Sequence, residues 1–393
     1  MILQNVNSKK SIYLGFILIF LGMLSAFAPL VTDMYLPTFP TLETEFKTTV
    51  SMIQLGLTAS MIGLAAGQIF FGPLSDMYGR KPILVSSLVL FCVATILCMY
   101  SGNITIFLYM RLLQGLGASG GIVLSRSVAT DLYSGRELAK MMAIIGAVNG
   151  VAPVTAPVIG GSVAAFAGWQ GIFCVLFFIG IVLLVMCLIF RESLPVSMRV
   201  HGSASSILKS YSILIKKRDF TYYVLSFAMS QGVLFAYISA APFIMQHDFG
   251  FSEMKFSIIF GINALGIGVG SAMSMKFNEM RKACVFGAAG MLVTAVAMLV
   301  FNILTQSFWT YEICAWLMLF FMGFVFTGAT TVAMDRGREY IGAASATVGA
   351  SGFLAGGLVS PLVGIGNTMV MCPAVCAACA VLSLVMSRSG YRK

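Results

Sequence analysis

The sequence predicts an all-α membrane protein with about twelve transmembrane helices. Of its 393 residues, 59% are hydrophobic and only 10% are charged, whereas a soluble domain carries about 25% charged residues. Apolar runs long enough to cross a bilayer follow one another with short connections. Since no region is long and polar enough to form a separate soluble domain, we expect nearly the whole chain to lie in the membrane.

The apolar runs cover roughly residues 12–39, 48–71, 82–101, 104–128, 138–164, 168–190, 220–246, 254–275, 283–304, 307–333, 340–365 and 367–387. The first run follows Lys9 and Lys10 as a signal peptide would. It is too long for one and lacks a small-residue cleavage site, so we interpret it as a retained span. The only long polar connection predicts an N-terminal six-helix bundle over 1–190, a cytoplasmic linker over 191–219 and a C-terminal six-helix bundle over 220–393.

The distribution of Lys and Arg predicts the orientation, because cytoplasmic loops are enriched in both. With both termini inside, the inner loops and tails hold 20 of the 24 basic residues. Lys47 and Lys255 fall outside, and Arg111 and Arg126 fall within the fourth run. The net charge of +10 therefore indicates orientation and not nucleic-acid binding, since the basic residues form no continuous patch.

The fifth run of each half is rich in small residues and proline. Small residues let helices approach closely, and proline bends them. Two six-helix repeats with such matching fifth helices favour an alternating-access machine. In the first half these residues are Gly146, Gly150, Pro153, Pro157, Gly160 and Gly161, and in the second they are Gly349, Gly352, Gly356, Gly357 and Pro361.

The short loop between the second and third runs predicts a conformational latch. Asp76 stands at the inner end of a helix, where the helix dipole disfavours an unpaired carboxylate. Arg80 and Lys81 are close enough to stabilise it, Gly72 allows close approach, and Gly79 permits a tight turn. Such a cluster is able to hold one conformation and release in another.

Several segments carry a family resemblance. Residues 72–81 resemble the conserved loop of the major facilitator superfamily, and residues 111–118 are similar to its intramembrane Arg motif. Residues 146–161 resemble the fifth-helix signature of its antiporters. Residues 32–37, Thr-Asp-Met-Tyr-Leu-Pro, resemble the start of the Bcr/CflA drug-efflux branch, which Asp131 and the Arg136-Glu137 pair also fit. In the C-terminal half the likeness rests mainly on span number, and residues 276–282 are a degenerate copy of the conserved loop.

The resemblance implies a major-facilitator fold of twelve helices in two pseudo-symmetric bundles, located in a bacterial inner membrane. It further implies a proton-coupled antiporter that exports drug-like or amphipathic molecules, for example bicyclomycin or chloramphenicol. An exporter of one specific metabolite, such as a siderophore, sugar or amino-acid derivative, is the alternative. The implied partners are a small-molecule substrate, protons and lipid. We expect a monomer with no cofactor, no metal and no nucleic acid.

Charges at membrane depth are costly and usually face a partner or a cavity. Asp33 and Arg111 lie at similar depths from the outer side, so they are predicted to pair or to communicate through water. Asp33 is the leading proton-binding carboxylate, and a static ion pair is the structural alternative. Arg126 fits a cavity residue and a snorkelling residue equally well. Glu312 lies beside Trp309 near the outer end of the tenth run, and an interfacial anchor is favoured.

Polar and aromatic side chains at helical spacing predict the substrate cavity, because aromatic walls with few polar groups suit amphipathic molecules. Each aromatic residue taken alone more often faces lipid or a neighbouring helix. The predicted lining residues are Tyr35, Gln54, Gln114, Arg126, Asn149, Tyr223, Phe227, Gln231, Phe235, Phe320 and Phe324.

The sequence disfavours other function classes. The two histidines, His201 and His247, are predicted on opposite sides of the membrane, and no H-E-x-x-H or Walker A motif occurs. Most of the nine cysteines lie in apolar runs without metal-ligand spacing. An importer of polar nutrients would be expected to show more polar cavity residues and to lack the antiporter-like fifth helix. These observations favour a transporter over an intramembrane enzyme or an ATP-driven pump.

Overall fold

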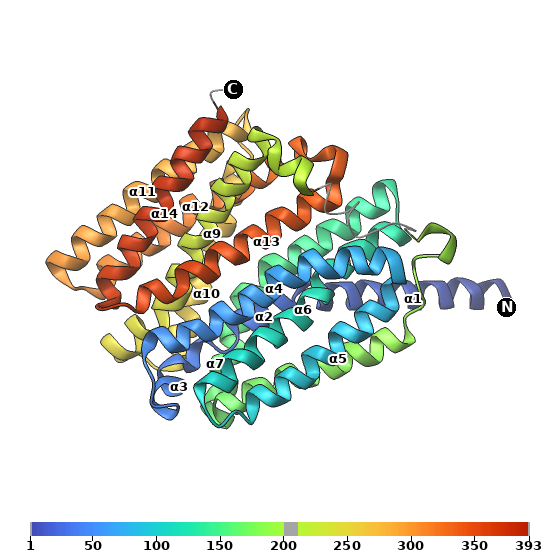
Figure 1. Ribbon diagram of the computed structural model, residues 1–393, viewed down its shortest axis with the longest axis horizontal. Coiled ribbons are helices and arrows are strands. Elements are labelled where there is room, and N and C mark those ends of the chain that lie inside the picture. Colours follow the sequence, from blue (N-terminus) through green and yellow to red (C-terminus); the bar gives the residue numbers. More distant parts are fainter. Residues whose placement is uncertain (1, 200–210, 392–393) are drawn as a thin grey trace.

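The computed structural model describes residues 2–199 and 211–391. Two groups of helices lie side by side, α1–α7 and α9–α14 (Figure 1). In the first group the helices are α1 (Ile2–Ser25), α2 (Phe27–Asp33), α3 (Phe39–Glu45), α4 (Val50–Tyr78), α5 (Arg80–Met99), α6 (Ile104–Leu132) and α7 (Gly135–Ile189). In the second they are α9 (Arg218–Pro242), α10 (Glu253–Ser274), α11 (Met280–Thr305), α12 (Phe308–Arg336), α13 (Ile341–Val359) and α14 (Thr368–Tyr391).

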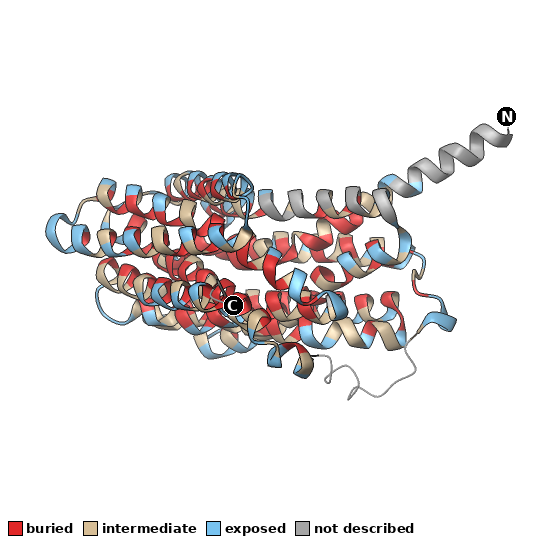
Figure 2. Ribbon diagram, turned by 90° about the horizontal axis from the view of Figure 1, so that it is seen from above, coloured by how far each residue is buried: buried red, intermediate tan, exposed pale blue. Residues whose placement is uncertain are grey.

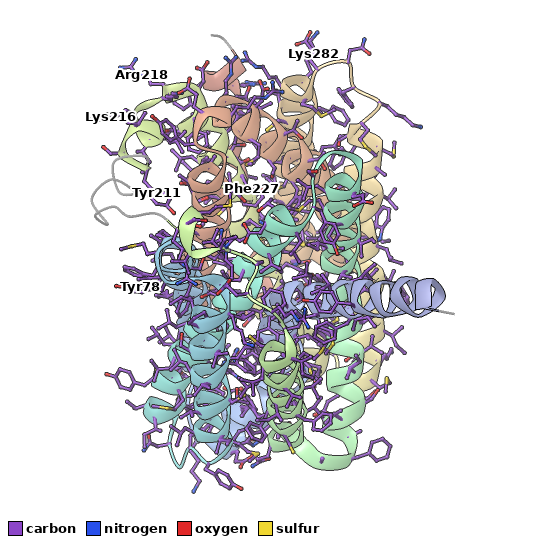
Figure 3. All side chains as sticks on the ribbon, turned by 90° about the vertical axis from the view of Figure 1, so that its right-hand side faces the viewer. Tyr78, Tyr211, Lys216, Arg218, Phe227 and Lys282 are labelled. Atoms are coloured by element: carbon purple, nitrogen blue, oxygen red, sulfur yellow. The ribbon has the colours of Figure 1, made fainter. Side chains whose placement is uncertain are left out.

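Short helical turns join some of these elements. They are η1 (Leu36–Thr38), η2 (Val196–Met198), η3 (Phe243–Asp248), η4 (Arg338–Tyr340) and η5 (Ser360–Gly364). We call the end of the molecule that carries residues 191–199 the linker end, and the opposite end, which carries Glu45 and Thr368, the hairpin end. Figure 3 looks from the side of the linker and shows Lys216, Arg218 and Lys282 at the periphery of the C-terminal half.

Eleven stretches of the described chain are long and apolar enough to cross a membrane. One of them belongs to α7, whose backbone departs from helical geometry at Gly168 (φ 62°). There the chain turns from one helical arm into another, so α7 supplies both predicted runs 138–164 and 168–190. Counted this way, the predicted twelve-span, all-helical fold is confirmed.

The first predicted span is interrupted where the sequence has prolines. Proline lacks a backbone N–H and so removes a helical hydrogen bond. The run predicted over 12–39 consists of α1, α2 and η1, with Pro37 in the first positions of η1, and the helical path continues to Glu45. The break leaves Asp33 as the last residue of α2.

The two halves are related residue by residue in their second and fourth spans. Thr49 and Ser252 cap α4 and α10 at matching positions, each accepting a backbone N–H with its side-chain oxygen. Counted from these caps, Gly67 of α4 corresponds to Gly270 of α10. A Cβ at Gly67 would strike Ser119 of α6, and a Cβ at Gly270 would strike the backbone of α12. Glycine at these points therefore allows the same close helix pair in both halves.

Burial follows this arrangement. Figure 2 shows buried residues concentrated between the helices and exposed residues on the outer faces. The exposed set contains many large apolar side chains, such as Phe70, Phe166, Phe178 and Val293. A soluble protein rarely exposes so many, so these faces suit contact with lipid.

Candidate functional site

Arg111 is fully buried at the centre of the N-terminal half. From α6 it donates hydrogen bonds to the Val31 carbonyl of α2 (2.9 Å) and to Ser60 Oγ of α4 (3.0 Å). It also donates to Gln114 Oε1 one turn further along α6. Its guanidinium lies over the Tyr35 ring, 4.1 Å from the centroid. The cation is therefore held by neutral groups from three helical segments.

Asp33 is also buried, with 4% of its surface exposed, and its Oδ1 has no hydrogen-bond partner. It lies next to the break between α2 and η1, and Tyr35 interacts with both Asp33 and Arg111. Among the described ion pairs none joins Asp33 to Arg111. The structure thus brings the two predicted charges to one region around Tyr35 without the static ion pair that was the structural alternative.

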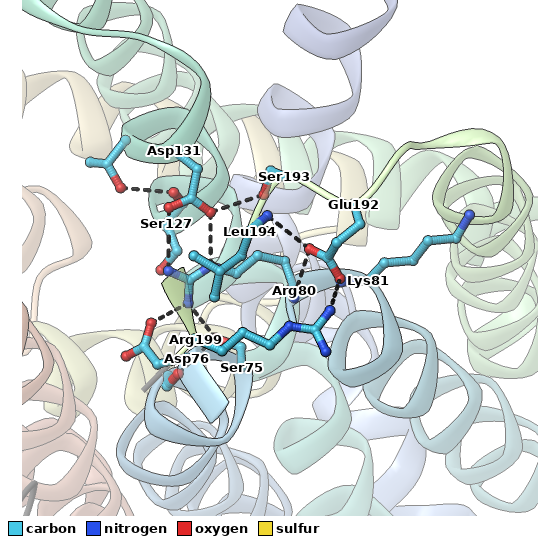
Figure 4. A network of polar contacts seen from close by, with 12 residues as sticks. Ser75, Asp76, Arg80, Lys81, Ser127, Asp131, Glu192, Ser193, Leu194 and Arg199 are labelled. Atoms are coloured by element: carbon cyan, nitrogen blue, oxygen red, sulfur yellow. Dashed lines mark hydrogen bonds and ion pairs between the residues drawn. The ribbon is translucent and has the colours of Figure 1, made fainter. Parts of the chain in front are cut away.

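Arg80 is the centre of a charged network at the linker end (Figure 4). Its side chain pairs with Asp76 one turn back along the chain and with Asp131 at the end of α6 (Nε to Oδ2, 2.9 Å). It also donates to Ser75 Oγ at 2.6 Å. Because these acceptors stand on α4 and α6 while Arg80 begins α5, one side chain ties three helices together.

Glu192, which the sequence prediction did not include, completes this network. Its carboxylate accepts the backbone N–H groups of Arg80 (3.0 Å) and Lys81 (3.1 Å), which begin α5. A carboxylate is favoured at a helix N-terminus because the first N–H groups have no intrahelical partner. Ser193 donates to Asp131 (2.9 Å), so the start of the linker is joined to the same cluster. The only feature of the sequence that points to this role is the position of Glu192, two residues after the predicted sixth span.

The two glycines of the predicted latch, Gly72 and Gly79, have different surroundings. Gly79 has φ 101° and ψ 155°, and a Cβ there would lie 2.5 Å from a Glu192 carboxylate oxygen. At Gly72 a Cβ would only touch Val123 at 3.4 Å. Gly79 is therefore required by backbone conformation and by the space beside the Glu192 carboxylate.

The corresponding region of the C-terminal half is a cavity of about 780 Å³. Asp335 occupies the position in α12 that Asp131 has in α6, but it pairs with Arg338 (2.9 Å) near the surface. Glu279 and Arg281 line the cavity. The charged cluster of the first half is thus not repeated, in agreement with a degenerate copy of the loop at 276–282.

Some predicted cavity residues lie where the two halves meet. Gln54 donates to the Ser239 carbonyl of α9 (3.1 Å), and Arg126 lies 3.4 Å from Ser345 of α13. Phe235 is close to Gly356 of α13 and to Met61 of α4. Gln231 and Phe227, by contrast, lie against Gly352 of α13, which belongs to the same half.

Other predicted cavity residues are packed within one half. Gln114 is buried between Arg111 and Thr95. Tyr223 is fully buried and lies beside Gly390 of α14. Phe320 and Phe324 belong to an aromatic cluster with Phe286 of α11, because these bulky rings fill the space between helices of the C-terminal half. Asn149, Gly146 and Gly150 lie outside the residues whose side chains are described.

The remaining residues of the predicted antiporter helix contact both halves. A Cβ at Gly160 would strike the Met34 carbonyl beside Asp33, and one at Gly161 would strike Ser257 of α10. Pro153 and Pro157 lie within the same arm of α7. This arm therefore packs against the Asp33 region on one side and the C-terminal half on the other.

Hydrogen bonds between the halves concentrate toward the hairpin end. Thr58 donates to the Gly357 carbonyl at 2.8 Å, Gln246 to the Pro37 carbonyl at 2.9 Å, and Ser51 to the Pro361 carbonyl at 3.5 Å. Together with the Gln54 bond they join α4 and η3 to the opposite half. The halves are thus in close contact at this end.

The match to a family model decides the family. The model of the Major Facilitator Superfamily matches residues 13–387. The chain belongs to this superfamily. It is accordingly a membrane transporter of the major-facilitator fold, in a family of transporters and not of enzymes.

Relatives within the superfamily include several named for drug resistance. The chain is 38% identical to the uncharacterized MFS-type transporter YdgK of Bacillus subtilis, over 93% of this chain and 92% of that one. It is 28% identical to the bicyclomycin resistance protein homolog of Haemophilus influenzae, over 97% and 96%. With the chloramphenicol resistance protein of Pseudomonas aeruginosa the identity is 32%, over 61% and 57%.

Solved structures agree with the fold. A bacterial homolog of the human lysosomal transporter Spinster, in an inward-facing conformation, matches with a TM-score of 0.78 at 16% identity, over 96% of this chain and 98% of that one. The xylose transporter XylE from E. coli matches with a TM-score of 0.74 at 15% identity, over 96% and 97%. At such identities the likeness concerns the fold alone.

Proposed function

We propose that this protein is a proton-coupled antiporter that exports drug-like, amphipathic molecules from the cytoplasm by alternating access. In this proposal it lies in the bacterial inner membrane as a monomer, with both termini and the linker in the cytoplasm and no cofactor. The two six-helix bundles, 1–190 and 220–393, move against each other around the linker 191–219. The drug-resistance relatives support the substrate class.

The buried pair of Asp33 and Arg111 is the observation on which the proposal rests. Asp33 has a buried carboxyl oxygen without a partner, and Arg111 is buried among neutral groups. Burial favours the neutral form of a carboxyl group, whereas a nearby cation favours its charged form. Motion of Tyr35, which interacts with both, changes that balance and so couples proton binding at Asp33 to helix movement.

The contacts between the halves suggest the order of steps in the proposed transport cycle. In this proposal the contacts at the hairpin end close the outer side, and substrate reaches the space between the halves from the linker end, the cytoplasmic side in our orientation. Substrate enters between the halves near Arg126, Gln231 and Phe235. Binding of the substrate promotes proton release from Asp33. The hairpin end then opens, and the substrate leaves on the outer side. The network of Asp76, Arg80 and Glu192 acts as the predicted latch, holding the start of the linker to α4, α5 and α6 in one conformation and releasing in another.

Purified protein in liposomes with an imposed pH gradient tests the proposal, with labelled chloramphenicol as the probe. We expect wild-type transport that depends on the gradient, and loss of gradient-driven transport in Asp33→Asn at equal membrane abundance. Glu339→Gln is the matched control, because Glu339 is exposed and pairs with Lys217 at the surface.

Two outcomes would contradict the proposal. Undiminished proton-coupled transport by Asp33→Asn would remove Asp33 from the coupling site. Transport by the wild type that ignores the pH gradient would exclude antiport altogether. Arg111→Lys keeps the positive charge but loses the planar group that binds Val31 and Ser60 together, so we expect it also to be transport-deficient.

A further inference from the structure

The C-terminal half contains a second carboxyl group with a buried oxygen atom, at Glu312 in α12. Its Oε2 is buried and has no hydrogen-bond partner, although Glu312 as a whole is only half-buried. The neighbouring side chains of Trp309 and Ile313 are exposed, with 69% and 58% of their surfaces accessible. Glu312 instead faces the interior of the half, toward α9 and α10.

Polar groups from three helices meet at this carboxyl. Asn263 of α10 interacts with Glu312 and donates a hydrogen bond to the Tyr237 hydroxyl of α9 (2.6 Å). Tyr311, the neighbour of Glu312 in α12, interacts with both Glu312 and Tyr237. Asn263 and Tyr311 are fully buried, yet Asn263 Oδ1 and the Tyr311 hydroxyl also lack partners.

The charges around Glu312 do not neutralise it. The described ion pairs include none with Glu312. The main neighbour of α12 is α11, whose charged residues, Arg281 and Lys282, both stand at its first turn, far along the chain from its hairpin end. The titratable groups that face the cluster are Tyr237 on α9, Tyr311 on α12 and the Cys372 and Cys376 thiols on α14. An unpaired carboxylate in such surroundings is unfavourable, whereas a proton on it removes the charge and supplies a hydrogen-bond donor.

Pseudo-symmetry relates this cluster to the Arg111 site. Counted from the caps Thr49 and Ser252, Asn263 has the position in α10 that Ser60 has in α4, and Ser60 accepts from Arg111. Counted from the first residues of α6 and α12, Glu312 lies one turn outward from the counterpart of Arg111. The first half thus holds a fully buried cation, and the second holds a half-buried acid in nearly the same place.

We propose that Glu312, with Asn263, Tyr237 and Tyr311 around it, is a second proton-binding site that belongs to the C-terminal half. The ligand is a proton: the carboxylate takes it up to form the neutral acid and gives it back as the carboxylate, with no other bond made or broken. The site itself follows from the cluster alone. Its use in the transport cycle rests on the proposed function.

Infrared difference spectroscopy of the purified, substrate-free protein between acidic and alkaline pH tests the site. We expect a carbonyl band of a protonated carboxyl group that changes with pH in the wild type and in the control Glu253→Gln, whose carboxyl lies in the first turn of α10. The band of Glu312 is expected to be missing in Glu312→Gln, and to shift in Asn263→Ala because the amide contacts the carboxyl. A spectrum of Glu312→Gln identical to that of the wild type overturns the proposal.

Transport measurements separate this inference from the function. In liposomes with labelled chloramphenicol, Glu312→Gln is expected to change the number of protons exchanged per substrate, whereas Glu253→Gln leaves it unchanged. If the wild type does not transport under a pH gradient but the infrared band is lost in Glu312→Gln, the site stands and the function fails. A sodium requirement that disappears in Glu312→Gln would identify a metal-cation site and overturn the proton assignment.

Discussion

Replacement of Gly79 by alanine tests the linker-end network most directly. At φ 101° and ψ 155° Gly79 occupies a region that is essentially restricted to glycine. The added Cβ would also lie 2.5 Å from Glu192 Oε2, so the carboxylate must move away from the N-terminus of α5. We expect Gly79→Ala to destabilise the protein through both effects.

The magnitude has two parts. A strained backbone of this kind costs about 1–3 kcal/mol. Displacing Glu192 weakens its hydrogen bonds from the Arg80 and Lys81 N–H groups, each worth about 1.5–3 kcal/mol for a charged acceptor. The Glu192 side chain is 25% exposed, so water recovers part of that loss. A total of about 3 kcal/mol, or about a hundredfold in the unfolding equilibrium, is expected.

Reversible unfolding by sodium dodecyl sulfate in mixed micelles, followed by circular dichroism, measures this free energy. Gly102→Ala is the matched control, because that loop glycine has open space around it. In a Glu192→Ala background, Gly79→Ala should cost the backbone strain and the contact with Arg199 Nη2 at 2.7 Å, so the double-mutant cycle isolates the clash with Glu192. The reasoning would be refuted if Gly79→Ala and Gly102→Ala lowered the free energy of unfolding equally. It would also be refuted if Gly79→Ala had the same effect in the wild type and in Glu192→Ala.

Three further predictions follow from the packing and the contacts between halves. Gly115→Ala should destabilise by at least about 2 kcal/mol, since a Cβ would lie 2.0 Å from a backbone oxygen of α4, whereas Gly268→Ala, in open space, should not; the same unfolding assay compares them. Thr58→Val removes one hydrogen bond between the halves, worth about 1 kcal/mol, and should raise the hairpin-open population about fivefold as measured by spin-label distances. Lys217→Ala should change stability by less than about 1 kcal/mol because its pair with Glu339 is exposed; a larger loss in the unfolding assay would contradict this estimate.

The sequence predicted the helices because apolar length is a local property. Most predicted runs correspond to one helix or, in α7, to an arm on either side of Gly168, whereas the first run is divided among α1, α2 and η1. The break that leaves Asp33 at the end of α2 was less visible, since a proline marks an interruption without saying where the helix resumes. The grouping of Arg80 with Asp131 and Glu192 depends on helix packing, which spacing along the chain does not encode.

Side-chain direction explains the other differences. Phe320 and Phe324 share one face of α12, as their spacing predicts, but that face meets α11 and not the opposite half. Glu312 stands near the outer end of its helix, where many carboxylates reach water. A rotation of α12 that buries Tyr311 turns the Glu312 carboxyl toward Asn263. Periodicity identifies a face, but only the tertiary structure identifies the neighbour of that face.

The hydrogen bonds that join the halves at the hairpin end suit a structure that must open there. Gln54, Thr58, Ser51 and Gln246 each donate one side-chain hydrogen bond to a backbone carbonyl of the other half. At about 1 kcal/mol each, they contribute about 4 kcal/mol, and none involves a charge. Moving a two-state equilibrium from one side to the other takes about 5.5 kcal/mol. In the proposed cycle, substrate binding together with proton release from Asp33 supplies this free energy, whereas ion pairs across the same end would raise the amount required.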